Sequence, residues 1–270
     1  MNNVLISYQF TRRMIFIYGT VYNNANTIEP VFASLDLIHD EKAFYYVDNF
    51  STDGTWEKLQ SMQEKYEIAI MRRKCSRGKG RSLAMNMAKS EASENDMFMY
   101  ADLDSPFSEI DIKRLTWYIE NMEKSSVLFG THLCYKDTNF SVEWRDLNSG
   151  EDWERMAHFI SAGFDMINFS PDGVWGLNEQ VAGYRELRYS HGISFLLRSL
   201  RNLVDIEIGS NFVTFKEYSY QFRSRIPTVL SYFLWVPYLY ARISGVYTYS
   251  KDLSNVEYVQ RSLRIIPPSY

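Results

Sequence analysis

The first hundred residues alternate short apolar runs with longer segments in which apolar residues recur at helical spacing. The short runs are residues 14–19, 43–47, 68–71 and 97–101. Their length and their Ile, Val and aromatic content are typical of buried strands. In the longer segments apolar residues share one face, as Ile28, Phe32 and Leu35 do, which predicts amphipathic helices. The repeated strand–helix order predicts an α/β, doubly wound fold with a mostly parallel sheet flanked by helices.

Turn and capping residues set the predicted boundaries. The two glycines within residues 76–80 indicate a loop, so the third helix is predicted over 81–92. The polar stretch 135–150 is also predicted to be a loop, and a helix is predicted to begin at Gly150. Further strands are predicted at 127–131 and 167–170, with a helix over 108–124 between the fourth and fifth strands.

Polar residues follow the predicted strands at their carboxyl ends. They are Tyr22, Asn23, Asp48, Arg72, Arg73, Asp102 and Asp104. In a parallel sheet these ends lie along one edge, which is where α/β proteins bind their ligands. An edge that combines amides, acids, bases and an aromatic ring is suited to a nucleoside diphosphate.

Asp102 and Asp104 directly follow the buried fourth strand. On an extended backbone, side chains two residues apart point to the same side. Two neighbouring carboxylates repel each other unless a cation lies between them. Oxygen ligands favour a hard ion, so the pair predicts a Mn2+ or Mg2+ site. The alternative is that both acids belong to a solvated loop.

Composition narrows the class of protein. The chain has 270 residues, 46% of them hydrophobic, which is enough for a packed core and unlike a disordered chain. Two cysteines provide neither a disulfide framework nor a cysteine-based zinc site, and they fit a reducing compartment. No secretory signal peptide is recognised over residues 1–13. We therefore expect a cytoplasmic protein without a nucleic-acid partner.

Charge divides the chain into two predicted units. Residues 1–184 carry a net charge of −9, whereas 185–270 contain 11 Lys and Arg against 6 Asp and Glu. The second unit is predicted to be a basic, aromatic, mostly helical extension. Its uncharged stretch 226–241 is interrupted by Pro237 and is shorter than the ~20 apolar residues of a spanning helix.

The aromatic extension has three alternative roles. It can pack as helices on the first unit, lie on the cytoplasmic face of a membrane through residues 195–249, or join subunits of a homo-oligomer through 226–249. Sequence alone does not choose between these roles.

Four segments, in this order and spacing, resemble family 2 glycosyltransferases of the GT-A fold. They are Tyr22-Asn23-Asn24, Val47-Asp48-Asn49-Phe50-Ser51-Thr52-Asp53-Gly54-Thr55, Arg77-Gly78-Lys79-Gly80 and Tyr100-Ala101-Asp102-Leu103-Asp104. The resemblance covers roughly the first 165 residues. It implies a nucleoside-diphosphate sugar donor, with UDP as the first expectation and GDP as the second.

The same resemblance assigns roles to residues of the donor site. Asp48 is expected to bind the base or ribose, and Tyr22 to line the base pocket with Asn23. Asp102 and Asp104 are expected to hold the ribose and the metal on the diphosphate. The residues expected to shape the nucleotide pocket are Asp53, Gly78 and Arg81. From the sequence alone, Asp53 is equally suited to a turn and helix cap.

An acid in the first turn of the helix predicted from residue 150 completes the implied site. Glu151-Asp152-Trp153 resembles the family's base element, so Asp152 is the expected catalytic base, although it is equally an ordinary first-turn carboxylate. The acceptor motif of processive synthases is absent, which favours the transfer of a single sugar. The resemblance implies an inverting reaction, and the aromatic extension favours a glycan or lipid-linked acceptor. His191 is a minority candidate for a further metal ligand.

Two other functions remain open at this point. One is a non-catalytic member that binds a nucleotide or glycan and acts as a membrane-docked partner. The other is a nucleotidyltransferase on a related fold. Nucleotidyltransferases of that kind resemble one another in a Gly-x-Gly-x-Arg segment after the first strand. At that place this chain has Gly-Thr-Val-Tyr-Asn, residues 19–23, which argues against this function.

Overall fold

The computed structural model describes residues 13–169, 193–210, 214–223, 232–244 and 262–266. The predicted boundary near residue 184 and the candidate ligand His191 lie outside these ranges. The division into two units therefore stays a prediction.

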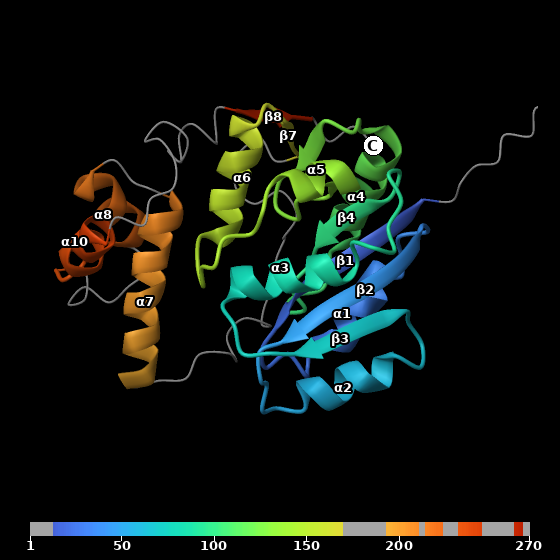
Figure 1. The fold of residues 1–270 in the computed structure, drawn as a ribbon, viewed down its shortest axis with the longest axis horizontal. Helices are drawn as coiled ribbons and strands as arrows, with labels where there is room; N and C mark the ends of the chain where they lie inside the picture. Colours follow the sequence, from blue (N-terminus) through green and yellow to red (C-terminus); the bar gives the residue numbers. More distant parts are fainter. Residues whose placement is uncertain (1–12, 170–192, 211–213, 224–231, 245–261, 267–270) are drawn as a thin grey trace, which may run out of the picture.

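The larger sheet has five strands in the order β3-β2-β1-β4-β6 (Figure 1). The strands are β1 (Met14–Val21), β2 (Glu41–Asp48), β3 (Ile68–Arg72), β4 (Met97–Tyr100) and β6 (Cys134–Tyr135). The first four are parallel and β6 is antiparallel to β4. The predicted α/β fold with a mostly parallel sheet flanked by helices is confirmed.

Helices cover both faces of this sheet because alternate strand residues point to opposite sides. The helices are α1 (Ile28–Leu35), α2 (Thr55–Met62), α3 (Arg77–Met87) and α4 (Glu109–Asn121). Ile15 and Ile17 of β1 belong to the core that contains residues of α1 and α4. Phe16 and Tyr18 belong to the core that contains residues of α3. The strand-to-helix pattern thus produces a doubly wound, three-layer arrangement.

Helix α3 begins four residues earlier than predicted. The side chain of Ser76 accepts a hydrogen bond from the Lys79 backbone N–H at 3.0 Å, which caps a helix that includes both glycines. A Cβ on Gly78 would lie 1.9 Å from the Arg145 carbonyl oxygen, and one on Gly80 1.9 Å from Thr20 Cγ2. These glycines therefore permit close packing, and the interpretation of residues 76–80 as a loop was wrong.

A second sheet of three parallel strands stands beside the first. Its strands are β5 (Ser126–Leu128), β7 (Asp165–Asn168) and β8 (Leu263–Ile265). Helix α6 (Glu151–Ser161) precedes β7 as predicted, whereas the predicted loop at 135–150 contains a further helix, α5 (Lys136–Ser141). Strand β8 comes from the C-terminal extension and lies beside β7 (Figure 1). Residues from both predicted units therefore share one sheet.

The described parts of the extension are mostly helical. They include α7 (Ile193–Ser210), α8 (Phe215–Arg223) and α10 (Trp235–Ile243). In Figure 1, α7 lies beside α6, and α8 and α10 lie on the other side of α7. Helix α7 approaches so closely that a Cβ on Gly209 would lie 2.6 Å from the Gly150 carbonyl oxygen. Pro237 lies in the first turn of α10, where its missing N–H is not needed, so it does not break this helix. Among the helices described, none is long and apolar enough to cross a membrane.

Candidate active site

Strand register brings the predicted site residues to one edge. Val21 pairs with Asp48, and Asp48 with Arg72, so β1, β2 and β3 end together. Tyr100 at the end of β4 pairs with Tyr18, and the Ala101 N–H donates to the Tyr18 carbonyl at 3.0 Å. The loops after all four parallel strands therefore project from the same edge of the sheet.

Asp48 is fully buried and is bound by Ser51 of the loop after β2 and by Arg72 of β3. Its carboxylate accepts the Ser51 N–H at 3.1 Å and the Ser51 hydroxyl, and it pairs with Arg72 Nε at 3.1 Å. Arg72 also donates to the Ser51 carbonyl at 2.7 Å. These contacts order the β2–α2 loop, and the contact of Asp48 with a base or ribose stays a prediction.

Asn23 and Asp53 join the loops that follow β1 and β2. The Asn23 side chain accepts the Thr52 N–H at 3.0 Å, and its backbone has a left-handed φ of 55°. Asp53 accepts the Ala25 N–H at 3.0 Å and the Thr55 hydroxyl at 2.6 Å. Nearby Tyr22 is 50% exposed, which leaves its ring accessible to a ligand. Asn23 and Asp53 thus support the loop on which Tyr22 lies.

We expect Asp53→Asn to lower the free energy of unfolding by about 0.5 kcal/mol at pH 7, because Asp53 is exposed and solvent weakens its hydrogen bonds. Burial raises the pKa of Asp53, but hydrogen bonds from the Thr55 hydroxyl and the Ala25 and Thr55 N–H groups lower that pKa below its ordinary value. A carboxylate with a lowered folded-state pKa stabilises the fold above its unfolded pKa, and this contribution is lost as the pH falls through the folded pKa. Urea unfolding of the wild type and the variant should therefore differ at pH 7 and converge in acid.

The exposed Asp137 provides the control for this titration. Asp137→Asn should leave the unfolding curve close to that of the wild type at both pH values. A pH-independent difference for Asp53→Asn would show that the carboxylate charge is not the stabilising feature.

Arg81 lies at the centre of the site and is almost fully buried. It donates to Asp102 Oδ2 at 2.6 Å and to Glu151 Oε1 at 2.8 Å. Its guanidinium lies 4.3 Å from the Tyr100 ring centroid and 4.8 Å from that of Trp144. Burial alone would lower the pKa of Arg81, but Asp102 and Glu151 raise it, so the guanidinium stays charged. Arg81 therefore links an acid after β4 to the first residue of α6.

Glu151 was not among the predicted site residues. It is fully buried and also lies 3.5 Å from Arg77 Nη1. Burial raises the pKa of Glu151, and Arg77 and Arg81 partly offset that increase. The sequence signal for Glu151 was its position immediately before Asp152. Its pairing with Arg81 of α3 is visible only in the folded chain, because the two residues are far apart in the sequence.

Asp152 lies in the first turn of α6, half-buried, beside this cluster. One of its carboxylate oxygens accepts the Trp153 N–H at 2.8 Å. Its charge acts on Arg81 and raises the pKa of Tyr100, whose main cause of elevation is burial. The structure therefore gathers Asp152, Arg81 and Asp102 near the end of β4, and the role of Asp152 as the base stays a prediction.

Strand β4 ends at Tyr100, so Asp102 and Asp104 both lie beyond it, and Leu103 and Asp104 form a turn. The Leu103 carbonyl between them accepts the Asn24 side-chain amide at 2.7 Å and the Thr27 hydroxyl at 2.5 Å. The turn is thus held by the loop before α1, including Thr27, the N-cap residue of that helix. The extended-strand geometry predicted for the two acids was wrong, and their role in metal binding stays a prediction.

Gly78 contributes to the site through packing. Its N–H donates to the Leu147 carbonyl at 2.9 Å, which brings the segment before α6 against α3. This contact helps to place Glu151 near Arg81. A direct contact of Gly78 with a nucleotide stays a prediction.

The sheet order defines an α/β protein with a mostly parallel sheet flanked by helices. The family model described as glycosyl transferase family 2 matches residues 17–172, which is more than half of the chain. The chain therefore belongs to glycosyl transferase family 2, and the predicted family and fold class are confirmed.

A curated relative is the dolichol-phosphate mannosyltransferase of Pyrococcus furiosus, 27% identical over 172 residues that cover 62% of this chain and 44% of the relative. The chain thus spans less than half of that relative's length. Among solved structures, a mannosyltransferase from Pyrobaculum calidifontis in complex with GDP-Man and Mn2+ is 14% identical, with a TM-score of 0.48 over 88% of this chain and 76% of that one. S. aureus TarS 1–349 in complex with UDP-GlcNAc is 12% identical, with a TM-score of 0.43 over 86% and 73%.

Proposed function

We propose that this chain transfers a single sugar from a nucleoside-diphosphate sugar to an acceptor hydroxyl, with inversion at the anomeric carbon. The observation that carries the proposal is the convergence of Asp102, Glu151 and Asp152 around buried Arg81. These acids come from two elements that meet at the ligand-binding edge of a parallel sheet. Family membership supplies the reaction class.

The donor would lie across the carboxyl ends of β1, β2 and β4. The exposed ring of Tyr22 is available to the base, and Asp48 lies at the adjacent strand end. UDP is the first candidate nucleotide and GDP the second.

The residues after β4 fit a divalent cation. Asp102 and Asp104 offer carboxylate oxygens, the ligands that Mn2+ and Mg2+ prefer. No group of three or more His, Cys, Asp or Glu suited to a metal is found within the described residues, and Mg2+ sites commonly use one or two carboxylates plus substrate phosphates. When bound, such an ion would neutralise the charge that develops on the leaving diphosphate.

The chain's own residues supply proton transfer and positioning. As the acceptor oxygen bonds to the anomeric carbon, the bond to the diphosphate breaks and the hydroxyl proton passes to Asp152. Glu151 is unsuited to that role because it is fully buried and paired with Arg81 and Arg77. Arg81 is a positioning residue that holds the acid after β4 and the start of α6 in fixed relation.

A lipid-linked acceptor is the acceptor class that we favour. The Pyrococcus relative is named for a dolichol-phosphate acceptor. In addition, α8, α10 and the turn before α10 expose large aromatic side chains, namely Tyr220, Tyr232, Phe233, Trp235 and Tyr240. Aromatic side chains of this kind are enriched at membrane interfaces. We therefore propose peripheral association with the cytoplasmic face of a membrane through this extension.

A ligand-stabilisation screen tests the donor and metal assignments. With UDP or GDP and Mn2+ at about 100 times Kd, the melting temperature should rise by about 5 °C or more. Asp104→Ala should lose the Mn2+-dependent part of the shift, whereas the exposed control Asp137→Ala should retain it. Stabilisation without any donor turnover would instead support a non-catalytic nucleotide-binding protein. No stabilisation by any nucleoside diphosphate would contradict the proposal.

A further inference from the structure

The start of α6 is held by residues that lie outside that helix. Its N-cap residue, Gly150, has a left-handed φ of 75° and provides no side-chain cap. Glu151 and Asp152 occupy the first turn, so the position of Gly150 sets where the proposed base lies. The contacts that fix residues 145–150 therefore bear on the reaction as well as on the fold.

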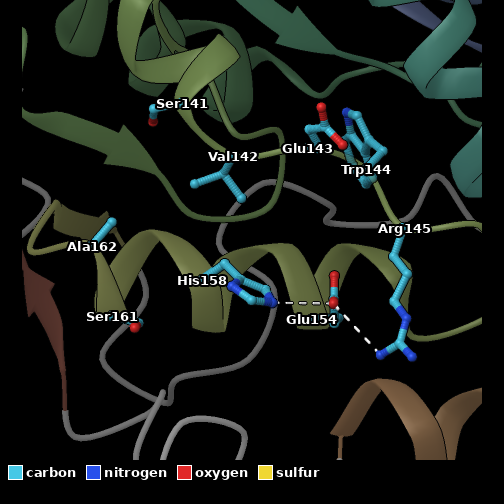
Figure 2. A pocket seen from close by; sticks show the side chains of 9 residues that line it. All are labelled: Ser141, Val142, Glu143, Trp144, Arg145, Glu154, His158, Ser161 and Ala162. Atoms are coloured by element: carbon cyan, nitrogen blue, oxygen red, sulfur yellow. Dashed lines mark ion pairs between the residues drawn. The ribbon is translucent and has the colours of Figure 1, made fainter. Parts of the chain in front are cut away.

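One set of contacts comes from the family-matched part of the chain. The Gly78 N–H of α3 donates to the Leu147 carbonyl at 2.9 Å. Arg145 Nη1 lies 3.7 Å from Glu154 Oε1 of α6, and Figure 2 shows the Arg145 side chain directed towards that carboxylate. All four residues lie within 17–172, the range that the family model matches.

Helix α7 supplies a second set of contacts. Asp205 Oδ2 accepts the backbone N–H of Asn148 at 3.0 Å and the side-chain amide of Asn148 at 3.2 Å. Gly209 is four residues further on, so it lies on the same face of α7. A Cβ on Gly209 would lie 2.6 Å from the Gly150 carbonyl oxygen, and one on Gly150 would lie 3.2 Å from Ile206 Cα. Contacts this close allow α7 and the start of α6 little relative movement.

Apolar packing joins the same segment to the extension. Leu147 is 5% exposed and belongs to one core with Ile208 of α7 and Ala241 of α10. Both helices lie beyond residue 172, outside the range that the family model matches. The extension therefore provides polar and apolar contacts to the stretch that leads into Asp152.

We infer that α7 is a positioning element of the active site, in which Asp205 and Gly209 hold residues 148–150 so that Asp152 faces the acceptor hydroxyl. The catalytic consequence rests on the proposed function, whereas the attachment of α6 to α7 does not. A misplacement of about 1 Å can cost about 10²-fold in rate. The extension thus contributes to turnover as well as to membrane contact.

Asp205→Ala in the full chain tests this role. It should lower kcat for sugar transfer about tenfold or more, while the Kd for UDP or GDP with Mn2+ stays within about twofold of the wild type. Nucleotide affinity is spared because the described hydrogen bonds of Asp205 go to Asn148 and not to the donor loops. Asp205→Asn keeps an oxygen that can accept both bonds, so it should recover most of the turnover. The exposed control Asp137→Ala should match the wild type.

A double variant shows whether Asp205 acts through the proposed base. Adding Asp205→Ala to Asp152→Asn should lower kcat little further, because the two losses then have one cause. A further tenfold loss or more would show that Asp205 acts elsewhere, and it would overturn the positioning role.

Hydrogen–deuterium exchange gives a readout that does not require turnover. In Asp205→Ala the amides of residues 147–156 should exchange faster, while those of β1 and β2 stay unchanged. Gly209→Ala leaves the carboxylate but adds a Cβ, and it should give the same exchange pattern and the same loss of kcat. Unchanged exchange or unchanged turnover in both variants would overturn the role of α7, as would equal losses of turnover and nucleotide affinity. If exchange changes as expected but the wild type transfers no sugar from any donor, the proposed function fails and the attachment stands.

Discussion

Asp152→Asn is expected to lower kcat for sugar transfer by about 10²- to 10⁴-fold, the usual contribution of a positioned general base. The amide cannot take the proton of the acceptor hydroxyl. Asp152 is half-buried at the start of α6, and its one described hydrogen bond is to the neighbouring Trp153 N–H. The substitution should therefore leave the fold and the affinity for the nucleoside diphosphate within about twofold of the wild type.

Paired measurements separate a base from a binding residue. Steady-state transfer gives kcat, and calorimetric titration with UDP or GDP and Mn2+ gives the nucleotide Kd. Asp137→Asn, which removes an exposed carboxylate on α5, should match the wild type in both. Full activity in Asp152→Asn would exclude the base role. Equal losses of turnover and nucleotide affinity would show that Asp152 binds the donor instead.

Arg81→Met is expected to lower the free energy of unfolding at pH 7 by about 3–5 kcal/mol, the typical result of breaking a buried ion pair. The change leaves Glu151 fully buried beside Asp102, with Arg77 at 3.5 Å as the remaining described cation near Glu151. Arg77→Met is the matched control. The Arg77 side chain is 50% exposed, so its loss should cost about 1 kcal/mol or less.

The Arg81 effect should depend on pH in a definite direction. Burial already raises the pKa of Glu151, and loss of Arg81 would raise it further. A carboxyl with a raised folded-state pKa destabilises the fold as the pH rises through that pKa. Urea unfolding should therefore show a smaller deficit for Arg81→Met at pH 5 than at pH 8. A deficit that is equal at both pH values would show that lost packing against Tyr100 and Trp144, rather than charge, dominates.

Local patterns were sufficient for most of the fold. Apolar runs located β1 to β4 because buried strands need Ile, Val and aromatic side chains. The stripe that begins with Ile28 and Phe32 is buried as predicted. The start of α3 was misplaced because glycine usually marks loops, whereas Gly78 here permits the approach of the Arg145 carbonyl.

Long-range contacts could not be predicted in the same way. The order of motifs indicated that Asp102 and Asp152 belong to one site. Nothing local indicates that Arg81 donates to Glu151, 70 residues later, or that Leu103 is held by Asn24 and Thr27. Such contacts depend on which loops the sheet order brings together. They determine that Glu151 is buried in ion pairs whereas Asp152 remains partly accessible.

Strand β8 gives the C-terminal extension a second attachment point. The chain leaves the smaller sheet after β7 and rejoins it when Leu263 pairs with Met166. The described part of the extension is therefore held at β8 as well as where α7 approaches Gly150. If the aromatic side chains of α10 rest on a lipid surface, the catalytic edge must stay within a short, bounded distance of that surface. Such an anchorage would favour acceptors whose hydroxyl emerges just above the headgroups.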